Sequence, residues 1–116
     1  MHERHFTFSS HASGPQSYPH SLIRCFLGDG PYSDMELISG ARHKLSLSLS
    51  EVERRLGQGH GFFRPDNSIL VNGHYALRIA TGNRSLLIMT IGRPVRISRR
   101  KKRIVKAFLR QKSTGC

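Results

Sequence analysis

The chain of 116 residues has little cysteine and no long apolar run. Its two cysteines are Cys25 and Cys116, the last residue, so a disulfide scaffold is excluded and a reducing cytosol is the expected compartment. No apolar stretch approaches the ~20 residues that a membrane-spanning helix needs. The start, MHERHFTFSS, lacks the basic end and the apolar block of a secretory signal. These absences predict a cytoplasmic protein, and the length predicts a single domain.

Motifs of catalysis and metal binding are absent too. The seven histidines are scattered, without an H-E-x-x-H pattern and without paired cysteines. The chain also lacks a G-x-S-x-G pattern and the Lys-Ser/Thr ending of a phosphate-binding loop. Cys25 lies in an apolar run, where a thiol is usually an inert core residue. We therefore expect a protein that is not an enzyme and that needs neither a metal nor another cofactor.

Acidic residues are scarce toward the end of the chain, and this is the most informative feature. The whole chain has 19 Lys and Arg against seven Asp and Glu, a net charge of +12. The last 26 residues contain no acid. Their basic residues are Arg93, Arg96, Arg99, Arg100, Lys101, Lys102, Arg103, Lys106, Arg110 and Lys112. The positive electrostatic field of these residues favours a polyanionic partner, either a nucleic acid or an anionic membrane surface. The simplest alternative is a basic tail that only increases solubility.

The membrane alternative depends on residues 99–112, which could lie on anionic lipid as a basic amphipathic helix. We do not favour it, because a domain this small needs the apolar face of that helix to close its core. The charge therefore indicates a nucleic-acid partner and no membrane.

Short apolar stretches separated by turn residues run from residue 22 onward. They are residues 22–27, 35–39, 43–47, 61–64, 68–72, 75–79, 85–91 and 95–97. Gly, Pro, Asn and Asp lie between most of them, which is typical of short strands joined by turns. Residues 1–21 are rich in His, Ser, Pro and Gly, and form either a weakly patterned strand and loop or a disordered segment. The pattern predicts a mainly β architecture with minor helices.

Two segments have the signals of helices. Ser48 and Glu51 fit a capping box, and Gly57 supplies a stop after about two turns. The face that this short helix buries is expected to consist of Leu49, Val52 and Leu56. Near the end of the chain, Ser98 is the expected N-cap of a terminal helix. Its apolar stripe is expected to consist of Ile104, Val105, Phe108 and Leu109.

The first turn of the terminal helix is made of cations: Arg99, Arg100, Lys101 and Lys102. Cations oppose the positive end of a helix macrodipole and cost up to ~1 kcal/mol each. Stability alone would place acids there. Free N–H groups and four cations form an anion site instead, and phosphate is the obvious anion.

Three segments occur in an order that resembles one family: SLSEVERRL, GFFRPDNSILVN and GRPVRISRRKK. The residues that match its pattern are Phe63, Arg64, Ser68, Val71, Asn72 and Ser98. From about Leu22 to Leu109, the chain resembles the LytTR-type DNA-binding domain of bacterial response regulators. The resemblance implies a mainly β fold of elongated, small antiparallel β-sheets with a short central helix and a C-terminal helix. It also implies a transcription regulator that inserts loops into the major groove of double-stranded DNA. The short length of the chain predicts that this regulator is a stand-alone domain.

The resemblance further implies which residues contact DNA. The loop before the second strand of the domain falls near Tyr32 and Ser33, the candidate loop contacts. Asn67 and Arg100, with its neighbour Arg99, are the expected base contacts. The expected phosphate contacts are Ser98, Lys101, Lys102 and Arg103.

The chemistry of these side chains is consistent with the implied roles. Asn can bond N6 and N7 of adenine together, and Arg can do the same with O6 and N7 of guanine. Asp66 stands where the family has a histidine, and a carboxylate repels phosphate and favours only donors such as cytosine N4. An alternative role for Asn67 is a turn residue that caps its own loop. Arg64 and Asn72 are expected to be structural, the first by packing its stem and the second in a turn.

We therefore expect a weakly matched N-terminal segment over residues 1–21, the DNA-binding domain over residues 22–112 and a tail over residues 113–116. The expected partners are double-stranded DNA, a second copy of the chain on repeated half-sites and a separate signalling protein. The alternative function is non-specific binding of RNA or DNA through the basic C-terminal region, with an affinity that falls steeply with salt.

Overall fold

Antiparallel strands are the predominant secondary structure of the chain. The structure is a computed structural model, and it describes residues 3–10, 14–57 and 59–114. At the N-terminal end, β1 (His5–Ser10) pairs with β2 (Gly14–Pro19). Both strands lie in the segment 1–21, where the sequence pattern predicts either a weakly patterned strand and loop or disorder. Residues 1–2 and 11–13 of that segment lie outside the described residues.

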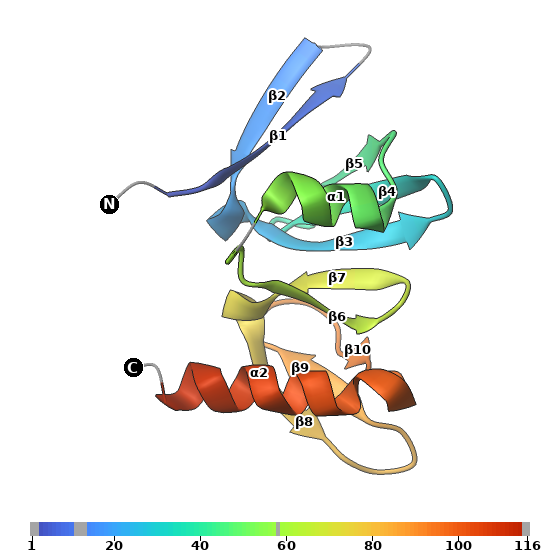
Figure 1. The fold of residues 1–116 in the computed structure, drawn as a ribbon, viewed down its shortest axis with the longest axis vertical. Coiled ribbons are helices and arrows are strands. Elements are labelled where there is room, and N and C mark those ends of the chain that lie inside the picture. The colour runs from blue at the N-terminus through green and yellow to red at the C-terminus, as the bar shows by residue number, and fades with distance from the viewer. Residues whose placement is uncertain (1–2, 11–13, 58, 115–116) are drawn as a thin grey trace.

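Two further antiparallel sheets follow in the chain (Figure 1). The larger has five strands in the spatial order β5 (Arg42–Leu45), β4 (Tyr32–Leu37), β3 (Ile23–Asp29), β7 (Ile69–Asn72) and β6 (Phe62–Asp66). The smaller has the order β10 (Val95–Arg96), β9 (Leu86–Met89) and β8 (Ala76–Ala80). The helices are α1 (Leu49–Leu56) and α2 (Lys102–Thr114). The predicted mainly β fold, with small antiparallel sheets and a central and a C-terminal helix, is confirmed.

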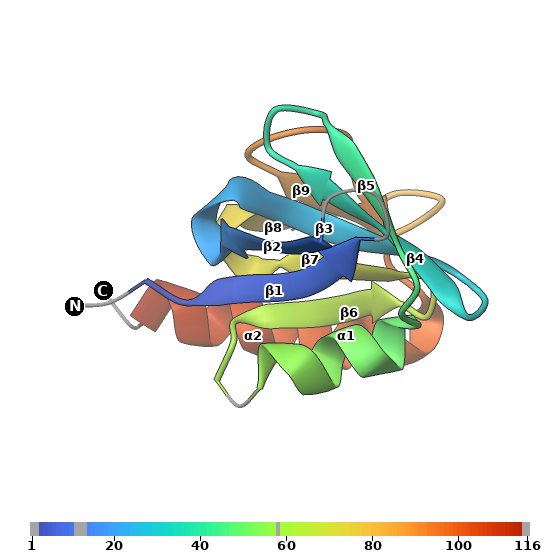
Figure 2. The same cartoon turned by 90° about the horizontal axis from the view of Figure 1, so that it is seen from above.

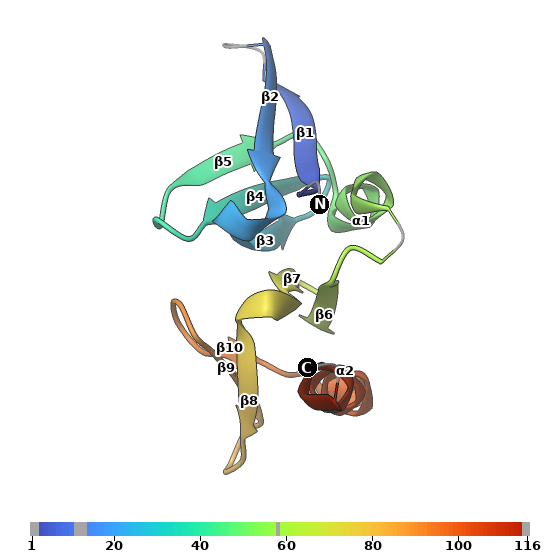
Figure 3. The same ribbon diagram turned by 90° about the vertical axis from the view of Figure 1, so that its left-hand side faces the viewer.

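The five-stranded sheet separates two apolar cores. Neighbouring residues of its strands point to opposite faces, so Phe26 lies in one core and Cys25 in the other. The first core lies under β1 and α1 and contains Phe6, Phe8, Ile23, Phe26, Met35, Leu45, Leu49, Val52, Leu56, Phe62 and Leu70. The second lies toward the small sheet and α2 and contains Cys25, Phe63, Ile69, Val71, Ala76, Leu87, Met89, Val95, Ile97 and Val105. Figure 3 shows both helices on the same side of the molecule.

The short helix α1 forms as the sequence predicts. The backbone N–H of Ser48 donates to Glu51 Oε1 over 3.0 Å, and the N–H of Glu51 donates to Ser48 Oγ over 3.3 Å. The predicted face of Leu49, Val52 and Leu56 is buried. The helix ends at Gly57, where φ is +79°. Local capping and apolar spacing therefore explain this element.

The terminal helix differs from the prediction at its start. A 3₁₀ turn, η3 (Arg99–Lys101), comes first, and the α-helix begins at Lys102. Ser98 has the extended backbone of a cap, but its side chain accepts no capping hydrogen bond. α2 reaches Thr114 and so overlaps the predicted tail, whose residues 115–116 lie outside the described residues.

The predicted apolar stripe of α2 is wrong at Ile104. Val105 is fully buried, and Phe108 and Leu109 are half-buried against the second core, but Ile104 is 51% exposed. Ile104 lies about 100° around the helix axis from Val105, and this places it at the margin of the helix face that packs against the second core. Ile104 is therefore available to solvent or to a ligand.

Contacts along the length of α2 fix its position. Before its start, the N–H of Ser98 donates to the carbonyl of Pro65 in β6 over 2.9 Å. In its middle, the Phe108 ring stacks on Phe63 with centroids 4.5 Å apart. Near its end, Lys112 Nζ donates to three carbonyl oxygens, those of Gly73, His74 and Ala76, over 2.6–3.0 Å. The basic start of the helix is thus held against β6.

Candidate nucleic-acid interface

Three connecting segments lie along one side of the molecule, the right-hand side in both Figure 1 and Figure 2. They are the β3–β4 turn (residues 29–32), the β6–β7 turn (residues 66–69) and the segment from Ser98 through η3 into α2. We call these three segments together the loop edge. All the residues predicted to contact DNA lie in the loop edge or directly beside it.

Asn67 lies exposed at the tip of the β6–β7 turn. The turn is closed by its neighbour, because Asp66 Oδ2 accepts hydrogen bonds from the N–H of Ser68 over 3.3 Å and from Ser68 Oγ over 2.6 Å. These bonds lower the pKa of the Asp66 carboxyl, which is therefore ionised at neutral pH. In the part of the chain that the structure describes, the Asn67 side chain has no hydrogen-bond partner, so Asp66 rather than Asn67 caps the turn.

The predicted base-contacting residues meet in one hollow of about 480 Å³. Its lining consists of Asn67, Ser98, Arg99, Arg100, Lys101 and Ile104. Asn67 and Arg100 are 33 residues apart in the chain, and the Ser98–Pro65 hydrogen bond brings their segments together. An amide and two guanidinium groups therefore converge on one concave surface of the loop edge.

The cations at the start of α2 are not neutralised within the described residues. Arg99, Arg100 and Arg103 are exposed, whereas Lys101 and Lys102 are half-buried. The first turn of α2 contains no acid, and no ion pair in the described ranges involves any of these five side chains. The positive end of the helix dipole adds to their field. This surface can hold several negative charges.

The two candidate loop contacts have opposite environments. Tyr32 is 48% exposed, and Lys44 Nζ lies 5.9 Å from its ring centroid. Ser33 is fully buried, because alternation along β4 turns its side chain inward and pairs it with Gly28 and Leu45. Of the two candidate loop contacts, only Tyr32 therefore exposes its side chain at the surface.

A second hollow, of about 330 Å³, connects the β3–β4 turn with the β6–β7 turn. It is lined by Gly28, Gly30, Ser48, Leu49, Ser50, Arg64, Asn67 and Ser68. Arg64 Nε pairs with Glu53 Oε1 over 3.2 Å, which ties β6 to α1. Asn72 Nδ2 donates to the carbonyls of His20 and Ile23, and its Oδ1 accepts from the N–H of His74. Asn72 thus has the structural turn role predicted for it, whereas the contact that the structure shows for Arg64 is an ion pair with α1.

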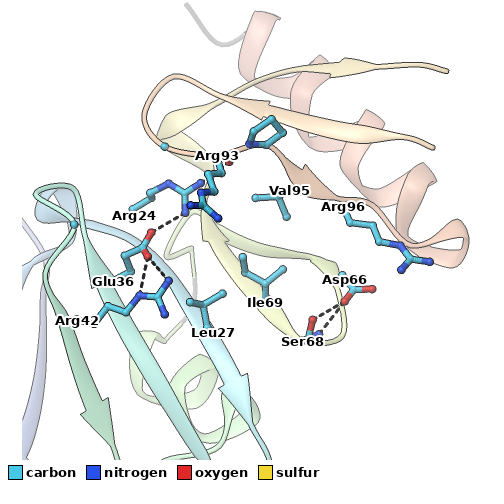
Figure 4. Close-up of a pocket in the computed structure, with 13 residues that line it drawn as sticks. Arg24, Leu27, Glu36, Arg42, Asp66, Ser68, Ile69, Arg93, Val95 and Arg96 are labelled. Carbon is cyan, nitrogen blue, oxygen red and sulfur yellow. Dashed lines mark hydrogen bonds and ion pairs between the residues drawn. The ribbon is translucent and has the colours of Figure 1, made fainter. Parts of the chain in front are cut away.

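Arg24 has a structural role that no sequence pattern indicates, and Figure 4 shows it between the two larger sheets. This side chain is buried in β3 and forms an ion pair of 2.9 Å with Glu36. Its Nε donates to the carbonyl of Ile91 over 2.8 Å, and its Nη2 donates to that of Arg93 over 2.6 Å. The contact requires Gly92, whose φ is +86° and whose added Cβ would lie 2.2 Å from Arg24 Nε. Arg24 therefore fixes the loop that leads into β10 and the loop edge.

Few groups in the described residues are suited to a reactive thiol site, a metal site or a membrane span. Cys25 is buried, and desolvation raises the pKa of its thiol to about 11. Residues 3–10, 14–57 and 59–114 contain no cluster of three or more metal-ligating side chains. Nor do these ranges include a helix with the length and apolar character needed to cross a bilayer. Cys116 lies outside the described residues.

One protein family matches most of the chain. Its model, that of the LytTr DNA-binding domain, matches residues 34–110. Among solved structures, the chain is similar to the LytTr DNA-binding domain of a protein described as a methyl-accepting/DNA response regulator from Bacillus cereus, with a TM-score of 0.71 and 21% identity. That match covers 93% of this chain and 98% of the other, and at this identity it shows the fold alone. No curated protein matches the chain. Because the family model covers more than half of its residues, the chain belongs to the LytTR family of DNA-binding domains.

Proposed function

We propose that this LytTR domain binds double-stranded DNA in a sequence-specific manner and acts as a transcription regulator. The turns of the loop edge enter the major groove, and the start of α2 lies on the phosphate backbone. The observation that carries the proposal is the hollow that Asn67 shares with Arg99 and Arg100. These are the side-chain types that bind adenine and guanine edges in a bidentate manner.

The roles divide by exposure and position. Asn67 and Arg100, with Arg99 beside it, contact bases, because they lie exposed at the hollow. Arg103 is exposed in the first turn of α2, and it contacts phosphate together with Lys101, Lys102 and Ser98. Tyr32 contributes from the β3–β4 turn. Asp66 does not meet phosphate, because its carboxylate is engaged in the turn by Ser68.

The alternative function is non-specific binding of RNA or DNA. It is favoured by the unneutralised cations at the start of α2, which attract any polyanion. The two functions make different predictions for the contribution of Asn67 and Arg100 to binding. If binding is non-specific, Asn67 and Arg100 contribute no preference for any base pair.

Alanine variants at three positions separate the two functions. Asn67→Ala and Arg100→Ala are each expected to lower discrimination at one base-pair position by about 1–3 kcal/mol, because a bidentate contact to a base is lost. Arg103→Ala is the matched control, and it should weaken binding to all duplexes alike and reduce the salt slope by about 1. Fluorescence anisotropy with site and scrambled duplexes at several salt concentrations measures both quantities. If the three variants behave alike, the assignment of base contacts is wrong.

We further infer that two copies bind side by side on repeated half-sites. This inference follows from family membership and from the single compact loop edge, which offers one reading surface per copy. We also infer that a separate signalling protein supplies the input. Titration of a duplex with one or two half-sites, followed by analytical ultracentrifugation, gives the number of copies bound.

A further inference from the structure

Ile104 is a large apolar side chain in an otherwise cationic part of the loop edge. It is 51% exposed, although the next residue, Val105, is completely buried. A single exposed apolar residue is common on protein surfaces. What distinguishes Ile104 is its place, because it lines the same hollow as Asn67 and Arg100.

The other side chains of that hollow are polar or charged: Asn67, Ser98, Arg99, Arg100 and Lys101. Ile104 is therefore the one apolar side chain among its six lining residues. It lies in the first turn of α2, directly after the 3₁₀ turn η3 that contains Arg100, and both residues line the hollow. A ligand that fills this hollow meets hydrogen-bonding groups, the aliphatic stems of the basic residues and Ile104, the one side chain of the lining that ends in methyl groups.

The major groove presents one apolar group among the edges of the base pairs, the C5-methyl group of thymine. Cytosine has only a hydrogen atom at the same ring position, and the other groups by which the base pairs are distinguished there are hydrogen-bond donors or acceptors. We propose that Ile104 contacts a thymine methyl group and so selects an A·T base pair next to those contacted by Asn67 and Arg100. This inference rests on the proposed function, since it needs the loop edge to enter the major groove.

Uracil in place of thymine tests the contact, because it removes the methyl group and keeps every hydrogen-bonding group. The binding site is first obtained by selection from a randomised duplex library, and each thymine is then replaced singly by deoxyuridine. We expect one position at which uracil weakens binding of the wild-type chain by about fourfold, the value for one buried methyl group. Fluorescence anisotropy measures each affinity.

Variants of Ile104 connect that position to the side chain. Ile104→Ala should bind the thymine duplex about fourfold more weakly and should lose its sensitivity to uracil at that position. Ile104→Val keeps an apolar surface and should remain sensitive. Leu77→Ala is the matched control, because Leu77 is 54% exposed on β8 and does not line the hollow. Circular dichroism checks that every variant is folded.

The outcomes distinguish this inference from the function on which it rests. A selected motif with uracil sensitivity that Ile104→Ala removes supports the thymine contact. A selected motif in which Ile104→Ala and the wild type respond equally to uracil at every position overturns the contact and leaves specific binding intact. A library that yields no motif overturns the proposed function and, with it, the role of Ile104.

Discussion

Replacement of Arg24 with methionine is expected to lower the free energy of unfolding by about 3 kcal/mol. The substitution removes an ion pair with Glu36 and leaves the carbonyls of Ile91 and Arg93 without their donor. Loss of one partner of a buried pair costs about 3–5 kcal/mol, and the lower end applies because Arg42 still pairs with Glu36 over 3.0 Å. Chemical denaturation with urea measures the change.

The control for this substitution is Arg42→Met. Arg42 pairs with the same carboxylate, but its side chain is 57% exposed. An exposed ion pair contributes only about 0–1 kcal/mol, so this variant should be nearly as stable as the wild type. Similar losses for Arg24→Met and Arg42→Met would show that burial and the two carbonyl bonds do not matter.

Gly73→Ala is expected to have an effect of similar size, about 3 kcal/mol of lost stability. A Cβ at this position would lie 2.1 Å from Phe108 Cζ and 2.6 Å from the carbonyl oxygen of Gly61. Phe108 cannot retreat freely, because its other contact is the stacked ring of Phe63. The addition therefore forces α2 away from the sheet. Thermal unfolding followed by circular dichroism measures the loss.

Gly82→Ala provides the comparison for this second prediction. An added Cβ at Gly82 would meet nothing within 4 Å, and its backbone does not adopt a positive φ. The expected change in stability is within about 0.5 kcal/mol, as for most surface substitutions. If both alanine variants are equally stable, the close approach of Phe108 to Gly73 does not constrain α2.

Much of the fold could be predicted from local signals. The capping box of Ser48 and Glu51, the stop at Gly57 and the alternation of apolar residues depend on neighbours in the chain, and these elements form as expected. The strand pairs β3–β4 and β4–β5 are joined by short turns that each contain a Gly with a positive φ, Gly30 and Gly40. Such features need no knowledge of distant contacts.

The features that sequence reasoning missed depend on contacts between distant residues. Arg24 is part of an apolar run, and its partner Arg93 is 69 residues away, so no local pattern indicates the contact. Ser33 is polar and next to a turn, which predicts exposure, but its position in β4 makes it face inward. Ile104 has the spacing of a core residue, and only the exact orientation of α2 leaves it exposed.

In the candidate site, too, local features could be predicted from the sequence and contacts between distant residues could not. The residue types at Asn67, Arg99 and Arg100 could be identified from the order of motifs in the chain. Their convergence on one hollow could not, because it depends on how η3 and α2 pack against β6, which includes the hydrogen bond between Ser98 and Pro65. The roles of these residues in DNA binding stay a prediction that binding experiments test.

The most direct test of sequence-specific DNA binding is selection from a randomised duplex library by the purified chain at near-physiological salt. We predict a recovered motif with A·T and G·C positions suited to Asn67 and Arg100, repeated about one helical turn apart. A library without a preferred sequence, bound with an affinity that falls steeply with salt, would contradict the account and identify a non-specific polyanion binder.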